Sequence, residues 1–239
     1  MKNIAYGLTC LLLLSAVLMA KDPGNQSVDS GAFGIFMNTR RVATETFSVQ
    51  QQSNGNSIIT SQIKDDGGTA AQSSELRLTS AGALVSYEWH ELAPNKTTLK
   101  VAPDGEFLRQ TVIEKPGDKP TEQPFLLPAT SAILDNNFFV HREILAWRYL
   151  QASCTPEAAG RKCGPGEFGV LVPQGRSSYH LNIQPIGDEK LKIGGVEQTL
   201  LHIDLKGDDG DWSLWLNTKD HYKLMRVTKA GEQVEIVRD

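Results

Sequence analysis

The stretch LHIDLKGDDGDWSLWL (201–216) decides the fold class, because it contains two alternating segments and the turn that joins them. Leu201, Ile203 and Leu205 alternate with polar residues, which is the period of a strand with one buried face. The following GDDG (207–210) consists of residues that tight turns prefer. Because the alternation resumes directly after this short turn, the stretch predicts an antiparallel hairpin.

The same alternation recurs along most of the chain on both sides of this hairpin. Apolar and polar residues alternate, for example, over residues 33–37, 85–90 and 179–183. Turn residues separate such segments, as in NGN (54–56) and PDG (103–105). These patterns indicate about a dozen strands, and a sheet of that size must curl or split in two. We therefore predict a mainly β protein with a strongly curved antiparallel sheet or an incomplete β-barrel.

One substantial helix is expected in the middle of the chain. The apolar residues that lie there at helical spacing are Val140, Ile144, Trp147 and Leu150. Asp135 precedes them and can act as the N-cap. The sequence predicts an amphipathic helix over about residues 136–152, packed across the concave face of the sheet.

Residues 31–239 are expected to form a single β-rich domain. Within them, residues 115–128 contain four prolines and predict a connection rather than a strand. This connection also allows an alternative, in which the chain divides there into two domains.

The N-terminal residues have the order of a secretory signal. Lys2 precedes the apolar run Ile4–Val17, and Ala20 offers a small residue for cleavage. The run is shorter than the roughly 20 residues that a membrane-spanning helix needs. We predict a signal peptide over residues 1–20. An uncleaved anchor is the alternative, because Leu18 stands where a small residue is preferred.

The remainder is expected to be exported to a bacterial periplasm or secreted. Residues 21–30 are small and polar, which predicts a disordered leader. No second long apolar run follows, so no transmembrane segment is expected in the mature chain.

The cysteines agree with export. Cys154 and Cys163 are the pair that remains after the signal is removed, and an even pair in an oxidising compartment predicts a disulfide. Pro156 and Gly160 allow the short intervening loop to turn back on itself. The bridge is expected to join the end of the helix to the next strand.

Charge and motifs exclude several classes of function. The net charge is −4, and removing Lys2 makes it −5, which argues against nucleic acid and anionic lipid surfaces as partners. The five histidines are isolated and lack the spacing of zinc ligands. The acidic turns at 65–68 and 208–211 lack the ligand spacing of a calcium loop. The sequence therefore predicts no metal, no cofactor and no catalytic set.

Aromatic residues suggest one candidate binding site. Trp212 and Trp215, with their leucine neighbours, place large side chains on both faces of one strand. Such a strand is either covered on both sides or lines a cavity with one of them. Together with Phe138, Trp147 and Tyr149 of the helix, these residues predict an apolar groove for a lipid-like ligand, with an ordinary core as the alternative.

Two stretches resemble exported bacterial β-rich domains of unknown function. The stretch GAFGIFMNTRRVATETF (31–47) is similar to their opening hairpin. The segments 215–220, 223–227 and 237–239 are similar to their closing strands, although Asn217 stands where those families have Asp. These families are broadly similar to periplasmic lipoprotein carriers, so the resemblance implies an incomplete barrel with a helical cover. It transfers no catalytic residue.

These observations favour an exported, non-enzymatic protein that binds a hydrophobic ligand or an envelope component. The alternative is a structural or protein-interaction domain of the cell envelope, which would present an exposed apolar patch or an open sheet edge. The third hypothesis is an enzyme of unrecognised type, which would need convergent polar groups in a cleft, such as His141 with Glu143 and a partner from a distant strand.

Overall fold

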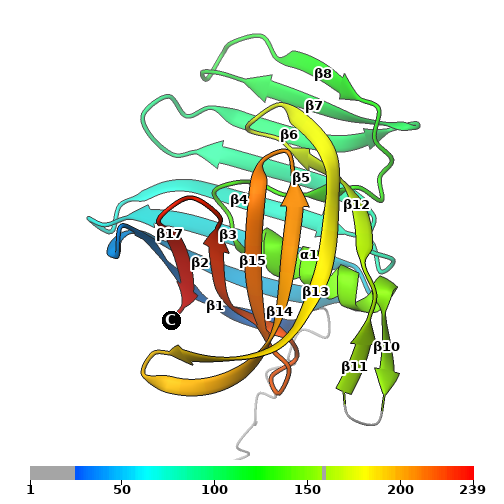
Figure 1. The fold of residues 1–239 in the computed structure, drawn as a ribbon. Helices are drawn as coiled ribbons and strands as arrows, with labels where there is room; N and C mark the ends of the chain where they lie inside the picture. The colour runs from blue at the N-terminus through cyan, green and yellow to red at the C-terminus, as the bar shows by residue number, and fades with distance from the viewer. Residues whose placement is uncertain (1–24, 158–159) are drawn as a thin grey trace, which may run out of the picture.

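The computed structural model describes residues 25–157 and 160–239, and these residues fold into one large sheet around one helix (Figure 1). The strands of the N-terminal half are β1 (Asn25–Met37), β2 (Arg40–Gln52), β3 (Ser57–Asp65), β4 (Ala70–Leu78), β5 (Leu84–Glu91), β6 (Thr98–Asp104), β7 (Phe107–Ile113) and β8 (Thr121–Phe125). The strands of the C-terminal half are β9 (Ala132–Ile133), β12 (Gly166–Val172), β13 (Ser177–Ile193), β14 (Val196–Gly207), β15 (Gly210–Asn217), β16 (Lys223–Lys229) and β17 (Val234–Arg238). The helix α1 (Val140–Ser153) precedes a separate hairpin of β10 (Cys154–Glu157) and β11 (Gly160–Cys163).

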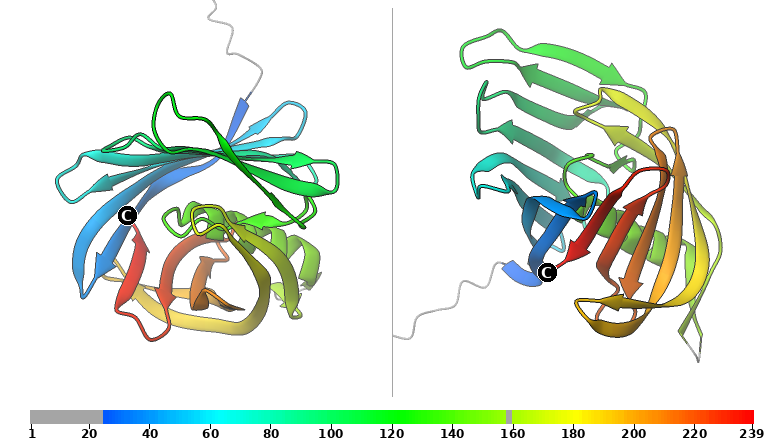
Figure 2. Two further views of the ribbon diagram at one scale, coloured as in Figure 1. Left: turned by 90° about the horizontal axis from the view of Figure 1, so that it is seen from above. Right: turned by 60° about the vertical axis from the view of Figure 1, so that its left-hand side comes forward.

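The fifteen strands of the sheet follow the order β8 to β1, then β17 to β12, and finally β9. Antiparallel pairing of β1 with β17 joins the two halves. Seen from above, the halves curve toward each other with α1 between them (Figure 2). Because the sheet ends at β8 on one side and at β9 on the other, it is not closed into a barrel. The predicted fold class, a mainly β protein with a curved, incomplete sheet, is confirmed.

The core lies between the inner face of the sheet and α1. Ile59, Leu76, Tyr87 and Val101 are aligned across β3 to β6 and are almost completely buried. Their neighbours along each strand point to the other face, as the period of two requires. The predicted turns are present too: Gly105, in the turn between β6 and β7, has a φ of 63°, which glycine adopts without strain.

The helix begins later than the sequence predicts. Residues 136–139 are not helical, and α1 starts at Val140. The carboxylate of Asp135 accepts a hydrogen bond from the backbone N–H of Asn137 at 2.9 Å, so it forms a local turn and does not cap the helix. The first half of α1 is also buried on every side, including the polar residues at 141–143, because the curved sheet surrounds it.

Two other segments differ from their predicted irregular state. Residues 25–30 belong to β1, where they pair with β2, and Asp29 is buried. Their polar side chains resemble a leader in composition, but backbone pairing and one buried ion pair hold them in the sheet. Residues 121–125, within the proline-rich connection, form β8 and pair with β7. The predicted signal peptide and residues 21–24 lie outside the described residues.

The disulfide between Cys154 and Cys163 is present, as predicted. Cys154 directly follows α1, and the two cysteines face each other across the β10–β11 hairpin. The bridge therefore fixes the end of the helix to this hairpin.

The outer half of the β13–β14 hairpin bends over the outer face of the sheet (Figure 1). The register between β13 and β14 shifts between Pro185 and Gly187. Beyond this bulge, Ile193 and Leu200 pack against Trp215, forming a small second apolar cluster. β15 is thus covered on both sides, which decides between the two alternatives that its sequence left open.

Candidate functional site

The position of α1 is set by a buried carboxylate from the sheet. Glu45 lies on the inner face of β2 and is completely buried. It accepts hydrogen bonds from the backbone N–H groups of Phe139 at 2.6 Å and Val140 at 3.3 Å, and from the hydroxyl of Ser61 at 2.7 Å. Burial raises the pKa of Glu45 from 4.5 to about 7, while these hydrogen bonds lower it in part. Glu45 supplies the N-terminal cap that the sequence assigned to Asp135.

A second buried cluster joins both ends of the chain to α1. Nη2 of Arg238 donates to both carboxylate oxygens of Asp29 at 2.7 Å, and Nη1 donates to Glu143 at 3.2 Å. The N–H of Leu224 donates to the same oxygen of Glu143 at 2.8 Å. Burial raises the pKa of Glu143 to about 8. The cluster thus connects β1, β16 and β17 to the helix.

His141 and Arg142 face the interior rather than a cleft. Burial lowers the pKa of His141 to about 3, so this histidine is neutral, and its ring lies edge-on to Tyr87. The guanidinium of Arg142 lies 4.1 Å from the ring centre of Trp212 and donates to the carbonyl of Asp135 at 3.3 Å. His141 is 1% exposed and Glu143 is completely buried, so neither side chain is accessible from the surface. The pair that illustrated the enzyme hypothesis is therefore buried and does not lie in a cleft.

A groove lies between the second half of α1 and the ends of β1 to β4. Its volume is about 220 Å³. The apolar residues that line it are Val28, Val49, Leu78, Ile144 and Trp147. The polar residues around them are Gln51, Ser57, Thr79, Ser80, Arg148 and Gln151. This groove occupies the place between helix and sheet where the sequence predicted an apolar binding site.

The groove has an apolar floor and a positively charged side. Val49, Leu78 and Ile144 are buried at its base, whereas Val28 is 48% exposed at its rim. Trp147 is held by a hydrogen bond from Nε1 to the carbonyl of Tyr222 at 3.0 Å. The twelve lining residues include Arg148 but no aspartate or glutamate.

The guanidinium of Arg148 is fixed in place. Its Nη2 donates to the carbonyl of Thr130 at 2.5 Å, and the group lies 5.7 Å from the ring centre of Phe168. Partial burial lowers the pKa of Arg148 from its usual value, which still leaves the group charged at neutral pH. The groove therefore combines an apolar surface with one positioned cation.

The structure does not bring the predicted aromatic residues together. Only Trp147 lines the groove. Phe138, Tyr149 and Trp212 are buried in the main core, and Trp215 belongs to the cluster on the opposite face of the sheet. The sequence did not indicate Val28 or Arg148 as lining residues. Val28 lies in the predicted leader, and Arg148 is a single charged residue on the helix.

Comparison of the chain with protein-family models, curated proteins and solved structures found no match. Along the described residues, no helix has the length and apolar character needed to cross a membrane. In the same residues, no group of three or more His, Cys, Asp or Glu side chains is arranged to hold a metal ion.

Proposed function

We propose that this protein is an exported, non-enzymatic binding protein for a single-chain anionic amphiphile, such as a fatty acid. The observation that carries the proposal is the groove beside α1, in which an apolar floor and Arg148 occur together without an acidic residue. The hydrocarbon chain would lie along Val49, Leu78 and Ile144, and the carboxylate would face Arg148.

The size of the groove limits the ligand. Pockets for drug-sized molecules have volumes from about 300 to 1,000 Å³, and this groove holds about 220 Å³. The core beside it is filled by residues such as Phe138 and Tyr149, both fully buried. A single narrow chain fits these dimensions better than a lipid with several chains.

Two features support an extracytoplasmic location. Residues 1–20 have the order of a secretory signal. The bond between Cys154 and Cys163 is of a kind that persists in oxidising compartments. A carrier of envelope amphiphiles would work in such a compartment.

The competing proposal, a protein-interaction domain that pairs through its open sheet edge, has weaker support. One edge of the sheet is β8, which carries Glu122 and Pro124, and the other is β9, whose two residues are buried. A charged residue and a proline are features that protect an edge from pairing with another chain. Leu126, next to β8, is 84% exposed, but β8 itself presents no exposed large apolar side chain.

The test is a titration of the exported protein with a long-chain fatty acid that carries bromine atoms, which quench nearby tryptophan fluorescence. The expected result is saturable quenching that is lost in Trp147→Phe, because only this tryptophan lines the groove. Val28→Trp should fill the rim and block binding. Arg148→Gln should weaken binding by about fivefold, since a partly exposed charge pair contributes about 1 kcal/mol.

The control is Arg40→Gln, which removes an exposed arginine far from the groove and should leave the affinity unchanged. Native mass spectrometry of the protein from its own host, in the absence of detergent, should show a bound mass that organic solvent removes. The proposal would be refuted if the protein from its host carried no bound mass and the brominated fatty acid did not quench its tryptophan fluorescence.

A further inference from the structure

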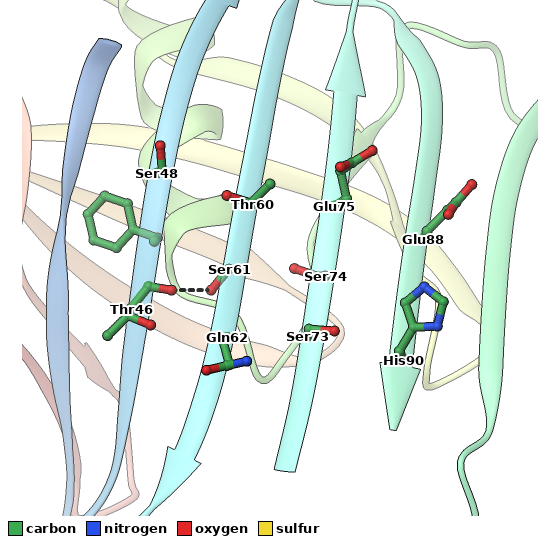
Figure 3. A pocket seen from close by; sticks show the side chains of 11 residues that line it. Thr46, Ser48, Thr60, Ser61, Gln62, Ser73, Ser74, Glu75, Glu88 and His90 are labelled. Carbon is green, nitrogen blue, oxygen red and sulfur yellow. Dashed lines mark hydrogen bonds between the residues drawn. The ribbon is translucent and has the colours of Figure 1, made fainter. Parts of the chain in front are cut away.

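A second, larger hollow lies on the outer face of the sheet, away from the groove. Its volume is about 580 Å³, within the range of ligand pockets. It crosses β2, β3, β4 and β5, and α1 lies behind these strands (Figure 3). The residues whose side chains line it on this face are Thr46, Ser48, Thr60, Gln62, Ser73, Glu75, Glu88 and His90. We call this hollow the outer trough.

The lining side chains form two rows that run across the strands. The first row contains Thr46, Gln62, Ser73 and His90, each directly opposite the next. The second row contains Ser48, Thr60, Glu75 and Glu88 in the same way. Neighbouring strands lie about 4.7–4.9 Å apart, so the rows offer a polar group at intervals similar to the length of one pyranose ring.

The charges of the outer trough are already compensated. Glu75 accepts a hydrogen bond from Nε of Arg77 at 2.5 Å, and Glu88 lies 2.9 Å from Nζ of Lys100. Ion pairing with Lys100 lowers the pKa of Glu88, which keeps this carboxylate ionised and paired. What remains for a ligand is a set of hydroxyl, amide and imidazole groups that both donate and accept hydrogen bonds. Such a set suits a neutral polyhydroxylated ligand better than an ion.

The trough continues toward β7. A further hollow of about 280 Å³ shares Glu88 and His90 with it and adds Thr98, Lys100 and Thr111 together with the apolar Leu99 and Ile113. The two hollows together extend over six neighbouring strands, from β2 to β7. A ligand that used the whole path would be an extended chain of several units.

We propose that the outer trough binds a neutral linear oligosaccharide, whose successive sugars lie across successive strands. Apart from the imidazole of His90, the side chains that line the trough on this face are not aromatic. Phe47, which also lines the hollow, is buried in the main core. Hydrogen bonds would therefore carry most of the binding, and because sugars exchange them with water, the affinity should be weak. This site is separate from the groove beside α1, and either can exist without the other.

The test is an array of neutral and acidic linear oligosaccharides, including cellohexaose and oligogalacturonate, probed with the full exported protein. Hits are then measured by calorimetric titration against two variants that delete hydroxyl groups and keep the shape of the surface. These variants are Thr60→Val and Ser73→Ala. Each should weaken binding by about threefold to tenfold, which corresponds to one lost hydrogen bond.

Thr199→Val is the matched control, because Thr199 is an exposed strand residue on β14 that lies outside the trough. It should leave the affinity unchanged, and so should Val28→Trp in the groove. Failure to retain any neutral oligosaccharide would overturn the proposal. Retention of acidic sugars alone, or equal binding by Thr60→Val, Ser73→Ala and the unmodified chain, would overturn it as well.

Discussion

The substitution Glu45→Gln tests how the sheet holds the helix. The carboxylate of Glu45 accepts hydrogen bonds from the N–H groups of Phe139 and Val140, and burial raises its pKa from 4.5 to about 7. Glutamine has nearly the same shape but does not titrate in this range. The variant therefore changes how stability depends on pH while keeping the packing around α1.

The magnitude follows from the pKa of Glu45. The raised pKa means that the carboxyl group of Glu45 binds its proton more tightly in the folded state than in the unfolded chain. The resulting stabilisation is complete below pH 4.5 and is lost as the pH rises through about 7. Since one pKa unit corresponds to about 1.36 kcal/mol, the protein should lose roughly 3 kcal/mol from this residue over that range. The variant should not show this loss.

The assay is urea unfolding, followed by tryptophan fluorescence, at a series of pH values for the variant and the unmodified protein. His141 and Glu143 titrate in both proteins, so their effects cancel in the difference between the two free energies of unfolding. Relative to the unmodified protein, the free energy of unfolding of the variant should rise by roughly 3 kcal/mol as the pH increases from 4.5 through about 7. Glu106→Gln, at an exposed turn residue, should show no such shift. Parallel pH profiles for Glu45→Gln and the unmodified protein would refute the reasoning.

Three further substitutions test other features of the fold. Arg238→Ala should lower the free energy of unfolding by about 3–5 kcal/mol in urea titrations, because it removes the partner of buried Glu143 and leaves buried Asp29 with only Lys223, at 3.6 Å; a loss below about 1 kcal/mol would contradict this. Replacing Cys154 and Cys163 with serine should cost roughly 2–3 kcal/mol, measured by calorimetry, because the bridge restricts the unfolded chain; an unchanged melting temperature would show that it does not. Trp215→Ala should cost about 3–5 kcal/mol and expose the β13–β14 hairpin to protease, since Ile193 and Leu200 would lose their partner; equal resistance to cleavage would argue that other contacts hold the hairpin.

The local pattern of the sequence was sufficient for the strands, the turns and the disulfide. Alternation of apolar and polar residues reports which face of a strand is buried, and short glycine turns report antiparallel neighbours. The same pattern could not show what covers Trp215, because two apolar faces require only that something lies on each side. The answer depends on the bulge near Pro185, which redirects a distant hairpin.

Contacts between residues far apart in the chain could not be predicted from the local sequence pattern. Glu45 caps a helix 94 residues away, whereas the local sequence pattern indicates Asp135, the nearby residue of suitable type. Asp29 pairs with Arg238 across 209 residues, and its segment was therefore mistaken for a leader. The outer trough was missed for a similar reason. Single serine and threonine residues on exposed strand faces do not indicate a binding site in the sequence, because only the register between strands aligns them in rows.

The pairing of β1 with β17 has a consequence for biosynthesis. Until residues 234–238 have been made, the two halves of the sheet have no strand to join them. Contacts between residues so far apart in sequence also slow folding. A nascent chain that lacks its last strand should accordingly remain open to added protease, whereas the complete chain becomes resistant. Synthesis from one end to the other should thus delay the joining of the two halves until residues 234–238 have emerged.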